Sequence, residues 1–182
     1  RAYSGEKLEP ETYTSYDLAL DNRDALAGDI YKNAESYYRS VFESAGGSIS
    51  FYPDKSGAVP TAELYRRETA EISVQGVREF CKKHGITENV FFISAFGITL
   101  GKYNFKKDAV FTTIYHGRND SRLSETVGML VKTLPVYCNF AGSTEQCLTE
   151  VQKQLINSMN NDIYPFSQIS HEFNIKADAM VV

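Results

Sequence analysis

Residues 108–140, DAVFTTIYHGRNDSRLSETVGMLVKTLPVYCNF, contain two apolar runs separated by a polar loop. The first run, from Asp108 to Gly117, is rich in β-branched and aromatic residues, which favour strands. The second run, residues 128–140, has the same character. Pro135 within it favours an edge or irregular strand, because proline cannot donate a hydrogen bond to a sheet ladder. The stretch therefore predicts two strands of a sheet.

Helical patterns flank these strands in the sequence. Residues 29–45 place apolar side chains near a three-four spacing, which predicts an amphipathic helix. Residues 74–83 predict a short helix, which Gly85 ends as a left-handed cap. Residues 87–103 are apolar nearly all round, which predicts a buried helix. After the strands, Ser143 and Gln146 form a capping box that begins another helix.

The remaining segments have weaker patterns. Residues 1–27 are polar, and the neighbourhood of Pro10 predicts an extended lead-in. Residues 62–73 alternate in part, which indicates a further strand. Pro165 suits the first turn of a short helix, and residues 178–182 predict the start of a buried strand.

Alternating helices and strands predict an α/β fold, specifically a two-layer sandwich of a mixed β-sheet with flanking helices. We expect residues 1–27 to be a lead-in segment and residues 28–182 to form one lobe with a single core, since 182 residues suit one domain. The chain begins with Arg1 and ends in an apolar run. We therefore expect it to be part of a longer polypeptide, with the lobe incomplete at its C-terminal end.

Composition excludes several functional classes. The net charge of −4 argues against a general nucleic-acid or anionic-membrane surface. No apolar run approaches the ~18 residues that a membrane span needs. The three cysteines lack CxxC spacing and the three histidines lie far apart, so the sequence predicts neither a metal site nor a disulfide framework. Reduced thiols in a cytoplasmic protein are the expectation.

The loop after the first strand contains the candidate functional side chains. His116 lies where a strand ends in a polar loop, where functional groups often occur. A general base also needs an orienting partner, which the sequence does not identify, so a surface histidine is the better interpretation. Arg118 is the stronger candidate for positioning a substrate, because Gly117 lets the backbone bend and a guanidinium can bind a carboxylate.

Two stretches, AFGITLGKYNFKKDAVFTTIYHGR (residues 95–118) and VGMLVKTLPVY (residues 127–137), resemble the second half of a condensation domain from nonribosomal peptide synthetases. In that family a buried helix leads to a strand that ends in a Gly-Arg pair. A segment of the form Ile/Val-Gly-x-Phe-Val-Asn-Thr follows. The residues that match this segment are Val127, Gly128, Val131 and Thr133.

Two further stretches extend the resemblance over essentially the whole chain. NNDIYPFSQI, residues 160–169, is similar to the family's His/Asn-Gln-Asp-Tyr-Pro-Phe-Glu motif, and YTSYDLAL, residues 13–20, is similar to Tyr-x-Asp-Tyr-Ala-Val-Trp. Four motifs in the right order and spacing are more specific than any one of them. The positions that depart from the family's residues are Ser15, Leu130, Lys132, Tyr137 and Ser167.

The resemblance implies the C-terminal lobe of a condensation domain, one of two chloramphenicol-acetyltransferase-like lobes with the reaction channel between them. The family's catalytic signature, His-His-x-x-x-Asp-Gly, would lie upstream of residue 1, and no His-His pair occurs in the chain. The resemblance therefore implies no catalytic residue here and no activity for the chain alone. The residues expected to line or position the substrate channel are Gly117, Arg118, Val127, Gly128 and Thr133.

The implied reaction forms an amide bond between two carrier-bound thioesters, with phosphopantetheine delivered by the carrier proteins and no cofactor or metal bound directly. Implied partners are the N-terminal lobe, peptidyl or aminoacyl carrier proteins and an adjacent adenylation domain. Three alternatives remain open: an epimerisation or heterocyclisation relative, a stand-alone acyltransferase, and a non-catalytic module that docks carrier proteins. The departures at Ser15, Lys132, Tyr137 and Ser167 favour the last alternative slightly.

Overall fold

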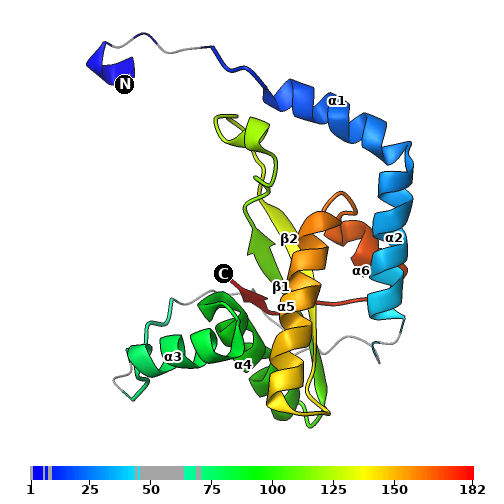
Figure 1. Cartoon of the computed structure of the whole chain (residues 1–182). Helices are drawn as coiled ribbons and strands as arrows, with labels where there is room; N and C mark the ends of the chain where they lie inside the picture. The colour runs from blue at the N-terminus through cyan, green and yellow to red at the C-terminus, as the bar shows by residue number, and fades with distance from the viewer. Residues whose placement is uncertain (1, 6, 8–9, 44, 46–63, 69–70) are drawn as a thin grey trace.

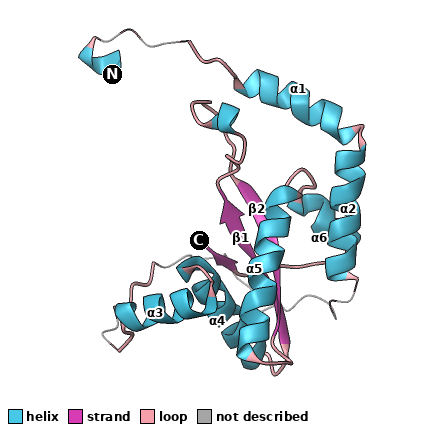
Figure 2. Cartoon of the chain, viewed as in Figure 1, coloured by secondary structure: helices cyan, strands magenta, loops and turns pink. Residues whose placement is uncertain are grey.

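The structure, a computed structural model, describes residues 2–5, 7, 10–43, 45, 64–68 and 71–182 (Figure 1). Along the described chain, four α-helices precede the first pair of strands, and two more α-helices lie between that pair and the last strand; Figure 2 distinguishes the helices from the strands. The helices are α1 (Ser15–Leu26), α2 (Asp29–Phe42), α3 (Val74–His84), α4 (Glu88–Tyr103), α5 (Thr144–Asn160) and α6 (Phe166–Glu172). The strands are β1 (Asp108–Tyr115), β2 (Lys132–Asn139) and β3 (Met180–Val181), and two short 3-10 turns are Ala2–Ser4 and Ser121–Leu123.

The described strands form one mixed sheet in the order β2-β1-β3. β1 and β2 are antiparallel, with a register that runs from Asp108 opposite Asn139 to Tyr115 opposite Lys132. β3 pairs with β1 in parallel, as Thr112 lies opposite Met180. Both predicted strands and the start of a final strand are confirmed. β2 is an edge strand of this sheet, which is where a strand tolerates Pro135.

Helices cover both faces of the sheet. One face of the sheet is covered by α4 and α5, and Ala109 and Phe111 lie there in the larger buried cluster, to which α3 also contributes by packing on α4. The opposite face places Val110 against α2 and the segment that contains α6, in a smaller cluster rich in tyrosine. The alternation follows from the pleat, because successive strand residues point to opposite faces. The expected mixed sheet with flanking helices is confirmed, and α2 with α6 adds a partial layer on the second face.

Local sequence signals fix several helix ends as expected. The capping box of Ser143 and Gln146 begins α5, with the Ser143 hydroxyl accepting the Gln146 N–H and the Gln146 side chain accepting the Ser143 N–H. Thr87 caps α4 by accepting the Val90 N–H. Gly85 ends α3 at φ +64°, the left-handed conformation that glycine adopts at low cost.

The lead-in segment also contains a helix that was not predicted, α1 at Ser15–Leu26. Two other expectations are wrong. Residues 64–68 and 71–73 form no strand in the described chain. Leu64 is fully exposed there, so an apolar strand face would have nothing to pack against. α4 is buried on one side only, since Phe92 is 47% exposed.

In the described part of the chain, none of the helices combines the length and apolar character needed to cross a membrane.

Candidate functional site

The loop that joins β1 to β2, residues 116–131, begins with a tight turn at Gly117. Its φ of +71° is a conformation that side chains other than glycine's adopt only under strain. A Cβ at this position would lie 1.9 Å from the carbonyl oxygen of Leu130, at the other end of the same loop. Gly117 therefore lets the two ends of the loop approach each other.

The side chain of Arg118 forms hydrogen bonds with the backbone of this loop. Its guanidinium donates hydrogen bonds to the carbonyl oxygens of Leu123 and Thr126, the latter from both Nη1 and Nη2 at 3.1 Å. The neighbouring His116 is exposed, and its Nδ1 accepts the Arg118 backbone N–H at 3.0 Å. Arg118 thus has a structural task in the loop. A role toward a substrate carboxylate stays a prediction.

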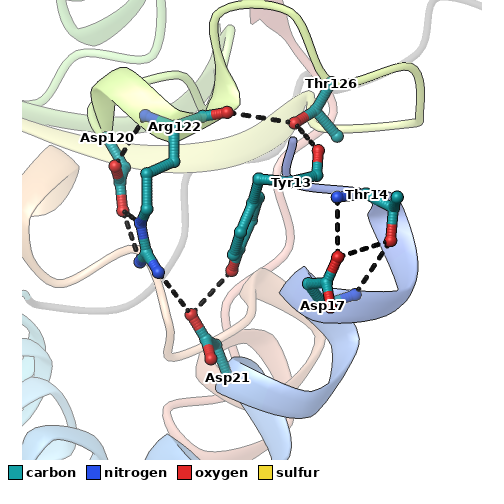
Figure 3. A network of polar contacts seen from close by, with 7 residues as sticks. All are labelled: Tyr13, Thr14, Asp17, Asp21, Asp120, Arg122 and Thr126. Atoms are coloured by element: carbon teal, nitrogen blue, oxygen red, sulfur yellow. Dashed lines mark hydrogen bonds and ion pairs between the residues drawn. The ribbon is translucent and has the colours of Figure 1, made fainter. Parts of the chain in front are cut away.

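The far end of the loop is attached to the start of α1 (Figure 3). The Thr126 hydroxyl donates to the Tyr13 carbonyl oxygen at 2.7 Å, and the Val127 N–H donates to Glu11 Oε1 at 3.2 Å. Residues more than a hundred positions apart in sequence are therefore joined here. The loop and the start of α1 form one polar assembly.

Arg122 is the centre of this assembly. Its guanidinium forms ion pairs with Asp120 at 2.6 Å and with Asp21 of α1 at 3.1 Å, and it lies over the Tyr13 ring, 4.5 Å from the centroid (Figure 3). The Tyr13 hydroxyl donates to Asp21 at 2.6 Å. These groups are exposed, so each pair contributes little alone. Together they fix the orientation of α1 against the loop.

Contacts in this assembly shift the pKa values of Asp120, Tyr13 and Asp17. Hydrogen bonds from Arg122 hold the pKa of Asp120 below its ordinary value. The hydrogen bond to Asp21 raises the pKa of Tyr13, since a phenolate there would lose it. At the start of α1, the Thr14 hydroxyl and N–H both donate to Asp17 and lower its pKa, completing a capping box.

Two cavities adjoin this assembly. The first, of about 830 Å³, lies between α1, the loop and the end of α5. The second, of about 700 Å³, lies between the start of β2 and residues 162–168. They share four lining residues, so they adjoin each other, and the two together are called the depression below. The shared residues are Asn22, Val131, Lys132 and Asp162.

An ion pair lies where the two cavities meet. Lys132 Nζ is 2.9 Å from Asp162 Oδ1 and also donates to the Asp162 carbonyl oxygen at 3.3 Å. The two side chains are 32% and 21% exposed. A half-buried pair of this kind is costly to break from one side only, because the remaining charge loses its partner. Lys132 and Asp162 therefore hold the start of β2 against the segment before α6.

The structure separates the five candidate residues into different places. Gly117 lines the first cavity and Thr133 lines the second. Arg118 binds the loop's own carbonyl groups. Val127 is 76% exposed beside the start of α1, and a Cβ on Gly128 would lie 3.3 Å from Ser15. The channel or positioning role of each remains a prediction.

Sequence reasoning missed the contribution of α1 and of Asp162. The signal for α1 was present as the Thr14-x-x-Asp17 capping pattern, although α1 has no buried residue and so no apolar stripe to reveal it. From the sequence, Lys132 is only a departure from the family's residue. Its partner Asp162 lies thirty positions away, which no local pattern indicates.

In the part of the chain that the structure describes, no group of three or more His, Cys, Asp or Glu side chains is arranged to hold a metal ion.

Removing the Thr126 hydroxyl should loosen the loop from α1. Thr126 is 2% exposed, so the change Thr126→Val keeps the side-chain shape and leaves the Tyr13 carbonyl without its donor. We expect the free energy of unfolding to fall by about 1–2 kcal/mol. Urea unfolding would measure it. Thr99→Val is the matched control, because that hydroxyl is exposed and bonds within α4. Equal losses of unfolding free energy in both variants would contradict the role of the Thr126–Tyr13 hydrogen bond in attaching the loop to α1.

The attachment of the loop should weaken in acid. The pKa of Asp120 is lowered in the folded state, so its contribution is complete above the unfolded carboxyl pKa of ~3.9 and is lost as the pH falls through the lower folded value. Amide hydrogen exchange at Arg122, whose N–H donates to Asp120, should therefore accelerate as the pH falls below about 4, beyond its intrinsic pH dependence. Asp120→Asn should remove this acceleration. An Asp120 pKa at or above the ordinary value in an NMR titration would refute the explanation.

Known proteins resemble this chain over nearly its full length. A family model described as Condensation domain matches residues 1–181. Nonribosomal peptide synthetase sidC of Arthroderma benhamiae is 28% identical over 171 residues, which cover 92% of this chain and 3% of that protein. Surfactin synthase subunit 1 of Bacillus subtilis is 26% identical over 187 residues, 98% of this chain and 5% of that protein. The chain thus spans a small part of these relatives.

Solved structures share the fold. The first condensation domain of the calcium-dependent antibiotic synthetase, in complex with a substrate analogue, matches with a TM-score of 0.73 at 14% identity, over 98% of this chain and 41% of that one. The X-domain from teicoplanin biosynthesis, in a complex with OxyB, matches with a TM-score of 0.73 at 16% identity, over 94% of this chain and 40% of that one. At these identities the likeness concerns the fold alone, and it agrees with the mixed sheet and flanking helices expected from the sequence.

Proposed function

The chain belongs to the condensation-domain family, and on that premise we propose that it forms the C-terminal, chloramphenicol-acetyltransferase-like lobe of a condensation domain in a nonribosomal peptide synthetase. The reaction of the whole domain is amide-bond formation. The amine of one carrier-bound aminoacyl group attacks the thioester carbonyl of the other, the carbon–nitrogen bond forms, and the carbon–sulfur bond breaks to release the carrier's thiol. Phosphopantetheine arms on carrier proteins deliver both groups.

This lobe binds and positions rather than transfers protons. The chain contains no His-His pair, so the acid–base group that the family uses for the amine is not among its residues. Its own residues would line the channel, orient a thioester and exclude water. Positioning of this kind can account for a large part of a bimolecular rate, but it does not replace a missing general base.

One observation carries the proposal. The four stretches that resemble family motifs lie far apart in sequence, yet each contributes residues to the two adjoining cavities. Tyr13 and Leu18 come from the first stretch, Gly117 from the second, Val131 and Thr133 from the third, and Tyr164 and Phe166 from the fourth. Convergence at one depression is what a shared substrate channel requires. Stretches that resembled the family motifs only by chance would not be expected to line the same cavities.

A second candidate is a docking module without chemistry. The likeness to the X-domain, which was solved in a complex with OxyB, shows that this fold occurs in a protein that binds a separate partner. The departures at Lys132 and Ser167, both beside the second cavity, are compatible with a changed channel. In this candidate the cavities would serve recognition only.

The two candidates differ in a direct assay. We expect the purified chain to form no amide bond between two carrier-bound aminoacyl thioesters, while a parent protein that adds the His-His-containing lobe forms it, as followed by intact-protein mass spectrometry. Replacing the histidine pair in that parent should abolish the product. Unchanged product after that replacement would support docking without chemistry, and condensation by the isolated chain at the parent's rate would refute the proposal.

A cavity-filling variant tests the channel itself. Val131 is 53% exposed and lines both cavities, so Val131→Trp should narrow the depression without disturbing the core. We expect the parent's rate of condensation to fall by roughly 10-fold or more, because misplaced reactants react far more slowly. Ile156→Trp on α5 is the matched control, since Ile156 is also 53% exposed. A rate that Val131→Trp leaves unchanged would exclude this depression as the channel.

A further inference from the structure

Two of the three cysteines lie together in the core. Cys138 is near the end of β2 and Cys147 is in the first part of α5, and their sulfur atoms are 3.4 Å apart. They are 0% and 1% exposed. The third cysteine, Cys81, is buried in α3. The sequence spacing gave no indication of this pair, because a strand end and a helix start bring the two positions into contact.

The surroundings restrict how the Cys138 sulfur can move. Cys138 is paired with Ala109 in the β1–β2 ladder, which holds its backbone. On another side α4 approaches so closely that a Cβ on Gly97 would lie 2.8 Å from the Cys138 sulfur. A disulfide bond is ~2.05 Å long, so the two sulfur atoms need to approach by only about 1.4 Å. The pair therefore needs only a small movement to close.

The environment shifts the pKa values of the two thiols in opposite directions. Either S–H can donate toward the other sulfur. The hydrogen bond lowers the pKa of the Cys147 thiol, whereas the same hydrogen bond, together with burial, raises the pKa of Cys138. The thiolate is the reactive form in disulfide exchange. Cys147 is therefore the sulfur that would attack first, and Cys138 the one that completes the bond.

We propose that Cys138 and Cys147 are an oxidative modification site, at which a low-molecular-weight disulfide converts the pair to a reversible disulfide that ties β2 to α5. The Cys147 thiolate attacks one sulfur of the reagent, forms a mixed disulfide and releases one reagent thiol. Cys138, after losing its proton, attacks the Cys147 sulfur and releases the second reagent thiol. Two protons and two electrons pass from the cysteines to the reagent, which is thereby reduced.

This modification is independent of the proposed condensation chemistry, and its consequence is mechanical. β2 begins at Lys132, beside both cavities, and ends near Cys138. A covalent bond to α5 would anchor the far end of that strand. Since both sulfur atoms are buried, the reagent reaches them through local opening of the β2–α5 contact. A reductant needs the same opening, so the disulfide should be reduced slowly while the protein is folded.

The test uses the folded chain and glutathione disulfide, followed by alkylation of the remaining thiols and digestion with trypsin. Cys138 and Cys147 fall in one tryptic fragment, Thr133–Lys153, and Cys81 falls in another, Glu79–Lys82. We expect the first fragment to lose two hydrogen atoms and take up no alkyl group. The unfolding temperature should rise by a few degrees on oxidation and return to its original value when a reductant is added.

Variants separate this pair from incidental oxidation. Cys81→Ser should leave the mass loss in the Thr133–Lys153 fragment unchanged. Cys147→Ser should abolish it, as should Cys138→Ala, which provides a second test if one variant folds poorly. The proposal is overturned if both cysteines of that fragment are alkylated or retain glutathione in the folded protein. Closure that occurs only in urea would overturn it as well.

Discussion

Replacing Gly117 by alanine should lower the free energy of unfolding by about 2–4 kcal/mol, among the largest effects of any single methyl group in this chain. Two costs combine. Alanine is strained at the φ of +71° that Gly117 adopts, and its Cβ would lie 1.9 Å from the Leu130 carbonyl oxygen. That contact is with backbone, so the two ends of the loop must move apart. Urea unfolding of Gly117→Ala measures the change.

Gly85→Ala separates the two costs. Gly85 has a φ of +64°, but a Cβ there would meet nothing within 4 Å. This control should therefore lose only about 1 kcal/mol, the cost of left-handed backbone for a residue with a Cβ. If both variants lost the same amount, the close approach of Gly117 to Leu130 would not be part of the folded loop. In the parent protein, Gly117→Ala should also reduce condensation, because Gly117 and Leu130 both line the first cavity.

Much of the sheet could be predicted because its signals are local. The strand pair β1–β2 has continuous β-branched and aromatic runs, and the helices α4 and α5 begin at side-chain caps that a short sequence pattern specifies. Pro135 indicated an edge strand for a reason that holds in any sheet. These features depend on residues a few positions apart.

The candidate site could be predicted only in part, because it depends on contacts between distant segments. The expected role of Arg118 toward a substrate stays a prediction, and the hydrogen bonds that its guanidinium donates to carbonyl oxygens of its own loop are a geometry that composition does not specify. Asp21 and Arg122 form an ion pair although they lie far apart in the sequence. α1 itself was missed because its contacts with the loop are polar, so it has no apolar periodicity.

Two departures from the family residues have partners in this chain. Lys132 forms its ion pair with Asp162 between the cavities. The Tyr137 hydroxyl donates to Asp108 at 3.2 Å, across the end of the strand pair. Each substitution is thus satisfied by a side chain on a neighbouring segment, as buried and half-buried polar groups need to be. Lys132 is thus matched by Asp162, and Tyr137 by Asp108.

Phe111→Ala should give the other large effect, a loss of about 3–5 kcal/mol in the free energy of unfolding. Phe111 is 0% exposed in the middle of β1 and packs edge-on against Phe96 of α4, with ring centroids 5.1 Å apart. Truncation removes most of its apolar contact and leaves a cavity that the sheet and α4 cannot both close. For a chain of this size the unfolding temperature should fall on the order of 10 °C, measurable by calorimetry.

Ile114→Ala on the same strand is the matched control. Ile114 is 40% exposed, so its truncation removes apolar surface that is already partly in water and should cost about 1 kcal/mol or less. The comparison tests the assignment of faces, because β1 points Phe111 toward α4 and leaves Ile114 accessible. If Ile114→Ala were the more damaging change, the side of β1 that α4 and α5 cover would be assigned wrongly. The register with β2, which places Ile114 opposite Thr133 at the second cavity, would then need to shift as well.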